Sequence, residues 1–200
     1  MDWNNKEDVL FAILKNGNSL QIASEKLKDD KEVVLSAVND WGWSLEFASD
    51  RLKDDPKIVI EACKNNSEAL KWASDKLKNN KNLVMEACKQ SGGALSYVSH
   101  ELRNNKEVVM EAMKNDGYFL IYASERLKND FEVVKTACNN FKYAFEFAGD
   151  KIKEQFSTPE ALLNSEKKIV KDNQWSKGNE EKANAWNDKV NSNKANDLER

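Results

Sequence analysis

Asp30-Lys31-Glu32-Val33-Val34-Leu35-Ser36-Ala37-Val38 begins a 25-residue unit that ends with Ser44-Leu45-Glu46-Phe47-Ala48-Ser49-Asp50-Arg51-Leu52-Lys53-Asp54. The unit occurs six times without insertion or deletion, and these repeats begin at Asn5, Asp30, Asp55, Asn80, Asn105 and Asp130. A fixed period of this length is typical of repeat architectures, in which one unit cannot bury its apolar face alone and packs on its neighbours. The sequence therefore predicts a stack of similar units.

The first half of each repeat has the apolar spacing of an α-helix, because Val33, Val34, Ala37 and Val38 follow a 3.6-residue period. Asp or Asn stands first in every repeat, where its side chain can cap the first helical turn. We expect this helix to be about ten residues long and to end at a glycine in the left-handed conformation. The glycines in question are Gly17, Gly42, Gly92 and Gly117.

The second half predicts another helix of about ten residues, since Leu45, Ala48, Ser49 and Leu52 share the spacing i, i+3, i+4, i+7. Short connections make each helix pair antiparallel. Two small-residue columns, headed by Ala12 and Ala23, predict close helix crossings. We therefore predict an all-α fold, a right-handed α-solenoid of six 25-residue helix-turn-helix repeats.

The two ends of the array differ from its middle. Asp8 replaces an aliphatic residue in the first repeat, which favours a polar terminal face. After the sixth repeat, Thr158 and Pro159 predict the start of a capping helix over about residues 159–170, which completes a repeat domain at 1–170.

From residue 171 to residue 200 the composition becomes polar, and we expect a flexible tail. Trp175 and Trp186 in this tail are open to two interpretations, incidental residues or a short partner-binding motif.

Composition excludes several classes of protein. The chain has a formal net charge of −3, a polar beginning, and no apolar stretch of the length needed for a signal peptide or a membrane span. Cys63, Cys88 and Cys138 share one core column, spaced too far apart for a disulfide and without the paired spacing of zinc ligands. We expect a cytoplasmic protein in a reducing compartment that binds no membrane; unconventional secretion as an effector is not excluded.

No catalytic motif is present: the sequence has no phosphate-binding glycine loop, no nucleophile elbow and no helix-borne zinc motif. The acidic residues form a regular series of caps and ion pairs, and His100 takes the place of a surface acid. We therefore predict no enzyme activity, no cofactor and no metal.

An aromatic column is the main surface candidate. It consists of Ile22, Phe47, Trp72, Tyr97, Tyr122 and Phe147, and Trp43, Tyr118 and Tyr143 lie four residues before it on the same helical stripe. Two interpretations are open: packing between repeats, or a protein-binding face, since aromatic residues are enriched in binding hot spots. The candidate binding residues are Trp43, Phe47, Trp72, Tyr97, Tyr118, Tyr122 and Tyr143.

A second candidate is a basic ridge, which consists of Lys28, Lys53, Lys78, Arg103, Lys128 and Lys153. One cation in each repeat could follow a chain of phosphates. Acidic neighbours and the negative net charge oppose this interpretation. Nucleic-acid binding is therefore not expected.

The clearest stretches of the consensus are Glu107-Val108-Val109-Met110-Glu111-Ala112 and Tyr122-Ala123-Ser124-Glu125-Arg126-Leu127-Lys128. The consensus resembles the tandem repeats of an uncharacterised family, domain of unknown function 4116, over residues 5–154. Ser67 and Lys142 depart from the turn glycine, and Val98 departs from alanine. The family occurs as arrays in bacterial, protist and viral proteins, including effector-like proteins. The resemblance implies a repeat architecture and suggests interaction, but it carries over no activity.

We therefore predict a non-catalytic repeat protein that binds a protein or peptide. The alternatives are an inhibitor, immunity-type or effector protein that masks another protein, and a purely structural stack that associates with itself. The sequence leaves the partner and the oligomeric state open.

Overall fold

The computed structural model describes residues 1–165, which form helices and contain no strand. The chain divides into two compact units, Met1–Pro159 and Glu160–Arg200. Residues 159–165 are helical, as predicted from Thr158 and Pro159. The rest of the predicted capping helix and the tail with Trp175 and Trp186 lie outside the described residues.

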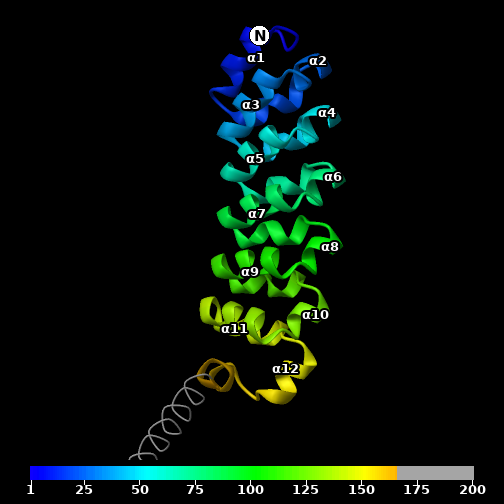
Figure 1. Ribbon diagram of the computed structural model, residues 1–200. Helices are drawn as coiled ribbons and strands as arrows, with labels where there is room; N and C mark the ends of the chain where they lie inside the picture. The colour runs from blue at the N-terminus through cyan, green and yellow to red at the C-terminus, as the bar shows by residue number, and fades with distance from the viewer. Residues whose placement is uncertain (166–200) are drawn as a thin grey trace, which may run out of the picture. The chain divides into compact units, whose positions relative to one another are not determined.

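Within the first unit, a pattern of long α-helix, 3-10 helix and short α-helix recurs with the repeat of the sequence (Figure 1). The long helices are α1 (Lys6–Ile13), α3 (Lys31–Asp40), α5 (Pro56–Asn65), α7 (Lys81–Gln90), α9 (Lys106–Asn115) and α11 (Phe131–Asn140). The 3-10 helices are η1 (Gly17–Ile22), η2 (Gly42–Phe47), η3 (Ser67–Trp72), η4 (Gly92–Tyr97), η5 (Gly117–Tyr122) and η6 (Lys142–Phe147). The short helices are α2 (Glu25–Lys28), α4 (Asp50–Lys53), α6 (Asp75–Lys78), α8 (His100–Arg103), α10 (Glu125–Lys128) and α12 (Asp150–Gln155).

The long helices begin where the sequence predicts. Oδ1 of Asp30 accepts hydrogen bonds from the amides of Glu32 (3.0 Å) and Val33 (3.2 Å), and the first residue of every other repeat caps its helix in the same way. Each side chain thus satisfies amides that have no partner within the helix. The predicted caps are confirmed.

The prediction of one continuous second helix is wrong. Ala48 and Ser49 are extended, with ψ of 154° and 157°, and they separate η2 from α4. In a continuous α-helix the amide of Ser49 would donate four residues back; it donates instead to the carbonyl oxygen of Lys28 in the preceding repeat (2.9 Å). The same bond recurs along the stack, from Ser74 to Lys53 and from Ser99 to Lys78. A hydrogen bond between repeats has replaced one within the helix.

The prediction that glycines end the long helices in a left-handed conformation is also wrong, because no glycine of the described residues has a positive φ. The glycine is required by a close approach: a β-carbon on Gly42 would lie 2.4 Å from the carbonyl oxygen of Ala62 in the next repeat. The amide of Gly42 donates to Oδ1 of Asn65 (2.8 Å), also in the next repeat. The position therefore couples neighbouring repeats.

Two layers form the stack. Each long helix packs on the long helix of the next repeat, as α3 does on α5, and each 3-10 helix packs on the next 3-10 helix. The core between the layers is apolar, and the column of Ala12, Ala37, Ala62, Ala87, Ala112 and Ala137 is buried throughout. Cys63, Cys88 and Cys138 are buried, free thiols, as predicted.

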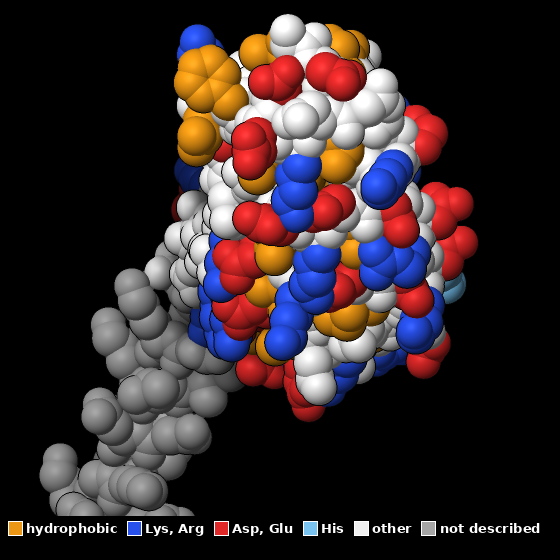
Figure 2. Space-filling view, turned by 90° about the horizontal axis from the view of Figure 1, so that it is seen from above, with side chains coloured by type: hydrophobic (Ala, Val, Ile, Leu, Met, Phe, Trp, Pro, Cys, Tyr) orange, Lys and Arg blue, Asp and Glu red, His pale blue; other side chains and the backbone are white. Residues whose placement is uncertain are grey.

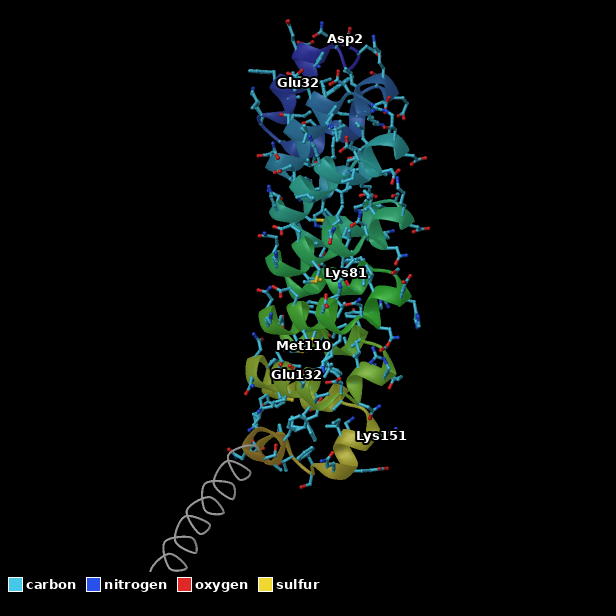
Figure 3. All side chains as sticks on the ribbon, viewed as in Figure 1. Asp2, Glu32, Lys81, Met110, Glu132 and Lys151 are labelled. Atoms are coloured by element: carbon cyan, nitrogen blue, oxygen red, sulfur yellow. The ribbon has the colours of Figure 1, made fainter. Side chains whose placement is uncertain are left out.

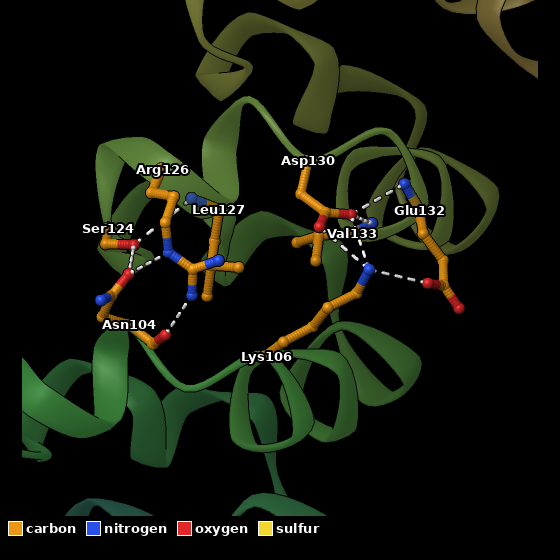
Figure 4. A network of polar contacts seen from close by, with 8 residues as sticks. All are labelled: Asn104, Lys106, Ser124, Arg126, Leu127, Asp130, Glu132 and Val133. Atoms are coloured by element: carbon orange, nitrogen blue, oxygen red, sulfur yellow. Dashed lines mark hydrogen bonds and ion pairs between the residues drawn. The ribbon is translucent and has the colours of Figure 1, made fainter.

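Side chains connect the repeats on the surface as well (Figure 4). The hydroxyl of Ser124 donates to Oδ1 of Asn104 (2.7 Å), which also accepts from Nε of Arg126 (2.9 Å). Nζ of Lys106 lies 2.9 Å from the carboxylate of Asp130 and 2.8 Å from that of Glu132. Each contact joins one repeat to the next.

The predicted polar terminal face is only partly correct. The carboxylate of Asp8 accepts a hydrogen bond from the amide of Asp2 (2.5 Å), so this polar residue binds the first residues of the chain to α1. Phe11 and Leu14 of the same repeat, however, are 54% and 78% exposed.

Candidate protein-binding surface

The 3-10 helices determine how the predicted aromatic residues lie. Side chains three residues apart are aligned on a 3-10 helix, so residues four apart do not share a stripe as they would on an α-helix. On η5 the aligned pair is Phe119 and Tyr122, whose rings stack with centroids 6.2 Å apart. Tyr118 instead contacts Phe147 of the next repeat, edge to face, at 5.4 Å. On η5 the predicted stripe is therefore divided: Tyr122 stacks within its repeat, and Tyr118 contacts the next one.

The predicted binding residues differ in exposure. Tyr118, Tyr122 and Tyr143 are 44%, 36% and 66% exposed. The other four, Trp43, Phe47, Trp72 and Tyr97, are half-buried. Of the seven predicted residues, the four in the second, third and fourth repeats thus contribute to packing, and the three tyrosines in the fifth and sixth repeats are open to solvent.

The exposed tyrosines belong to a connected cluster on η5 and η6. The ring of Tyr118 makes edge contacts with Phe119 (5.4 Å) and Phe141 (6.2 Å), in addition to Phe147. Phe141 in turn contacts Tyr143 at 5.6 Å. Mutual contacts of this kind restrict the rotamers of the rings. We call these residues, together with Tyr122 and the 38% exposed Ile121, the aromatic cluster.

Sequence reasoning missed Phe119, Ile121 and Phe141. Column comparison could have found the first two: Phe119 stands where every other repeat has serine or alanine, and Ile121 stands in a column of polar residues. The column of Phe141 contains both polar and aromatic residues, so an aromatic residue there does not stand out. The apolar departures therefore concentrate in the fifth repeat.

Cations beside the aromatic column form hydrogen bonds or ion pairs with other groups of the chain. Cζ of Arg103 lies 5.8 Å from the centroid of the Tyr122 ring, and Nη2 donates to the carbonyl oxygen of Ser96 (2.7 Å). Nζ of Lys153 donates to the carbonyl oxygen of Glu146 (2.7 Å). In the same basic ridge, Lys28, Lys78 and Lys128 pair with the acids three residues before them, at 2.8, 3.7 and 2.8 Å.

The other predicted chemical groups have ordinary surroundings. Burial raises the pKa of the Cys63 and Cys88 thiols to about 12 and that of Cys138 to about 11, so neutral pH leaves them protonated. His100 is exposed. Within residues 1–165, no group of three or more histidine, cysteine or acidic side chains is placed to hold a metal ion. No helix of the same residues has the length and apolar character needed to cross a bilayer.

Several open hollows mark the surface of the described residues, including the following two. One, of about 390 Å³, lies where the third repeat meets the fourth and is lined by Ser67, Gln90 and Phe119 among others. The second, of about 660 Å³, lies over α7 and α9, with Met85 and Met110 among lysine and glutamate side chains. Figure 3 shows Met110 and Glu132 of this second hollow on neighbouring levels of the stack.

The recurring three-helix pattern, joined between repeats by backbone and side-chain bonds, defines the chain as a helical-repeat protein. The profile of a family described as a domain of unknown function (DUF4116) matches residues 5–53, 30–78, 55–103 and 105–153, and the chain belongs to this family. Each match spans two successive repeats, so the predicted resemblance is confirmed. No curated protein and no solved structure matches the chain.

Proposed function

We propose that the chain is a non-catalytic binding protein, a right-handed α-solenoid of six 25-residue repeats that holds a protein or peptide on its aromatic cluster. The single observation that carries this proposal is the exposure of Tyr118, Ile121, Tyr122 and Tyr143 side by side on η5 and η6. Exposed apolar groups gathered in one place are typical of interaction sites, whereas scattered ones need no explanation.

The chemistry of the cluster supports the same role. The hydroxyls of Tyr118, Tyr122 and Tyr143 make no hydrogen bond within residues 1–165, so they can bind polar groups of a partner while the rings bury apolar ones. Because the rings already contact one another, little side-chain entropy is lost on binding. Such rigid aromatic residues are efficient anchors.

The surrounding groups support a protein ligand rather than a nucleic acid or a substrate. Most cations of the basic ridge already pair with an acid or a carbonyl oxygen of the chain, which leaves little free positive charge for phosphates. The buried thiols are protonated and therefore poor nucleophiles. We extend the proposal to a protein of the cytoplasm, in keeping with three free cysteines.

A peptide-display selection tests this proposal. Peptides enriched on the intact chain should lose at least about tenfold in affinity for a Tyr118→Ala, Tyr143→Ala variant, because exposed aromatic anchors each contribute more than about 1 kcal/mol. The matched control is Met110→Ala, which alters the hollow over α7 and α9 and should leave the affinity unchanged. Equal binding by the tyrosine variant, with an unchanged circular dichroism spectrum, rejects the aromatic cluster as the site.

The identity of the partner distinguishes the special forms of this function. An inhibitor or immunity-type protein would reduce the activity of a captured enzyme. A purely structural stack would select no peptide and would instead associate without limit, which light scattering detects.

A further inference from the structure

Helix α1 differs from every other long helix in having no polar side between residues 9 and 14. Val9, Ala12 and Ile13 are buried in the core, as in the other repeats. The outward positions hold Leu10, Phe11 and Leu14, although the columns of Phe11 and Leu14 carry only serine, threonine, glutamate, asparagine or lysine in repeats two to six. A helix that is apolar on all sides is normally covered on all sides.

The uncovered side of α1 corresponds to the side on which the other long helices contact the preceding repeat. Asn65 and Asn115, in the column of Lys15, donate hydrogen bonds to carbonyl oxygens of the preceding repeat, such as Asn39 and Cys88. Phe11 lies one turn before Lys15 and therefore on this same side. Figure 2, which looks onto this end of the stack, shows hydrophobic side chains grouped along one edge.

Charges on both sides of Phe11 indicate what covers it. Glu7, Phe11 and Lys15 follow one another at intervals of four residues, so Glu7 and Phe11 lie on one face of α1 and Lys15 lies in the turn directly after it. Nζ of Lys15 lies 4.3 Å from the centroid of the Phe11 ring. Neither Glu7 nor Lys15 forms an ion pair with another residue of the described chain. The face is thus acidic at one end, aromatic in the middle and basic at the other end.

We propose that two copies of this chain form a closed dimer in which the α1 helices pack antiparallel around a two-fold axis at Phe11. This arrangement places Glu7 of each chain opposite Lys15 of the other and the two Phe11 rings against each other. A parallel arrangement would instead oppose like charges. A two-fold interface must be self-complementary, and this face has that property.

The far end of the first unit favours a closed pair over an open fibre. Phe156 packs on Phe131 of the sixth repeat with ring centroids 5.7 Å apart, so the chain itself covers residues that would meet a following repeat. Head-to-tail association would have to displace this contact. Two chains joined through α1 would bury this apolar face on both.

Charge exchange tests the proposal. Analytical ultracentrifugation of the full chain should show a monomer–dimer equilibrium, and either Glu7→Lys or Lys15→Glu should raise the dimer dissociation constant about tenfold, because each creates two repulsive pairs. An equimolar mixture of the two variants should regain the wild-type constant, since both pairs are attractive in the mixed dimer. Phe11→Asp should abolish the dimer.

Controls separate this result from a loss of folding. Lys57→Glu reverses the charge in the Glu7 column of the third repeat and should not affect association. All variants should retain the thermal midpoint of the monomer. A wild-type chain that stays monomeric at the highest soluble concentration, a dimer that survives Phe11→Asp, or a mixture that fails to regain association overturns the proposal.

Discussion

At Gly117, the carbonyl oxygen of Ala137 in the next repeat lies 2.1 Å from where a β-carbon would be, so only glycine fits without movement. The third repeat shows the consequence of losing this fit. Ser67 takes the glycine position there. Gln90 takes the position of Asn65, whose side chain accepts the hydrogen bond from the amide of Gly42. Both line the 390 Å³ hollow at that junction. Lys142 takes the same position in the last repeat and is exposed, where no seventh repeat follows residue 154.

Gly117→Ala should therefore lower the free energy of unfolding by about 1–3 kcal/mol, the usual effect of overfilling a packed contact. Restricting the unfolded chain acts in the opposite direction by only about 0.4–1 kcal/mol, so the clash decides the sign. Lys142→Ala, in the same column, should change the stability by less than about 0.5 kcal/mol. Urea titration measures both, and a Gly117→Ala variant as stable as the wild type would contradict the close approach.

Among the helices, the long ones were predictable and the second halves of the repeats were not. Apolar spacing and a capping residue are local, so Val33, Val34 and Asp30 defined α3 correctly. The spacing of Leu45 and Leu52, by contrast, suits an α-helix and also a 3-10 helix followed by a new turn. The hydrogen bonds that end η2 and begin α4 join Ser49 to Lys28 and Asp29 of the preceding repeat. The sequence of one repeat does not contain these partners.

Contacts between repeats also limited what the sequence could predict about the aromatic cluster. Sequence identified Tyr118, Tyr122 and Tyr143 as candidates from their size and regular spacing. It placed Tyr118 and Tyr122 on one stripe because it assumed an α-helix, and it missed the contact of Tyr118 with Phe147 in the next repeat. Exposure could not be predicted either, because it depends on how far the neighbouring 3-10 helix covers each ring.

One asparagine shows how elements of different repeats are joined. Asn140 at the end of α11 accepts a hydrogen bond from the amide of Gly117 (3.2 Å) and donates to the carbonyl oxygens of Lys114 (3.0 Å) and Asn115 (3.1 Å). Asn140→Ala should lower the free energy of unfolding by about 1–2 kcal/mol, because these hydrogen bonds between repeats are lost and the amide of the buried Gly117 loses its partner. Asn139→Ala, next to it and solvent-exposed, should have almost no effect. Chemical denaturation of the two variants should therefore differ, and equal midpoints would refute the bridging role.

Over the whole molecule, carboxylates repeat at the junctions, so their titration affects many repeats at once. Hydrogen bonds from Ser49 and Arg51 lower the pKa of Asp29, and Ser74 and Lys76 do the same for Asp54. Lys31 and the helix amides lower the pKa of Asp55.

The capping aspartates Asp30 and Asp130 balance opposing effects. Burial acts to raise their pKa, but the lysine of the preceding repeat and the amides of the helix together outweigh it, so each pKa is lowered. These carboxylates are shared between a cap and an ion pair with Lys6 or Lys106. Protonating them therefore weakens a helix start and a junction together.

A lowered pKa in the folded state means that these groups stabilise the fold above the pKa of the unfolded chain, near 3.8, and lose that contribution as the pH falls through the folded value. We therefore expect the thermal midpoint to be nearly constant above about pH 5 and to fall steadily below about pH 4. Asp30→Asn with Asp130→Asn should make this fall shallower and should lower the midpoint at neutral pH, because asparagine keeps the cap, as in the fourth and fifth repeats, but loses the charge that pairs with Lys6 or Lys106. Thermal unfolding followed by circular dichroism at a series of pH values measures the slope, and a slope unchanged in the double variant would show that these junction carboxylates do not control acid stability.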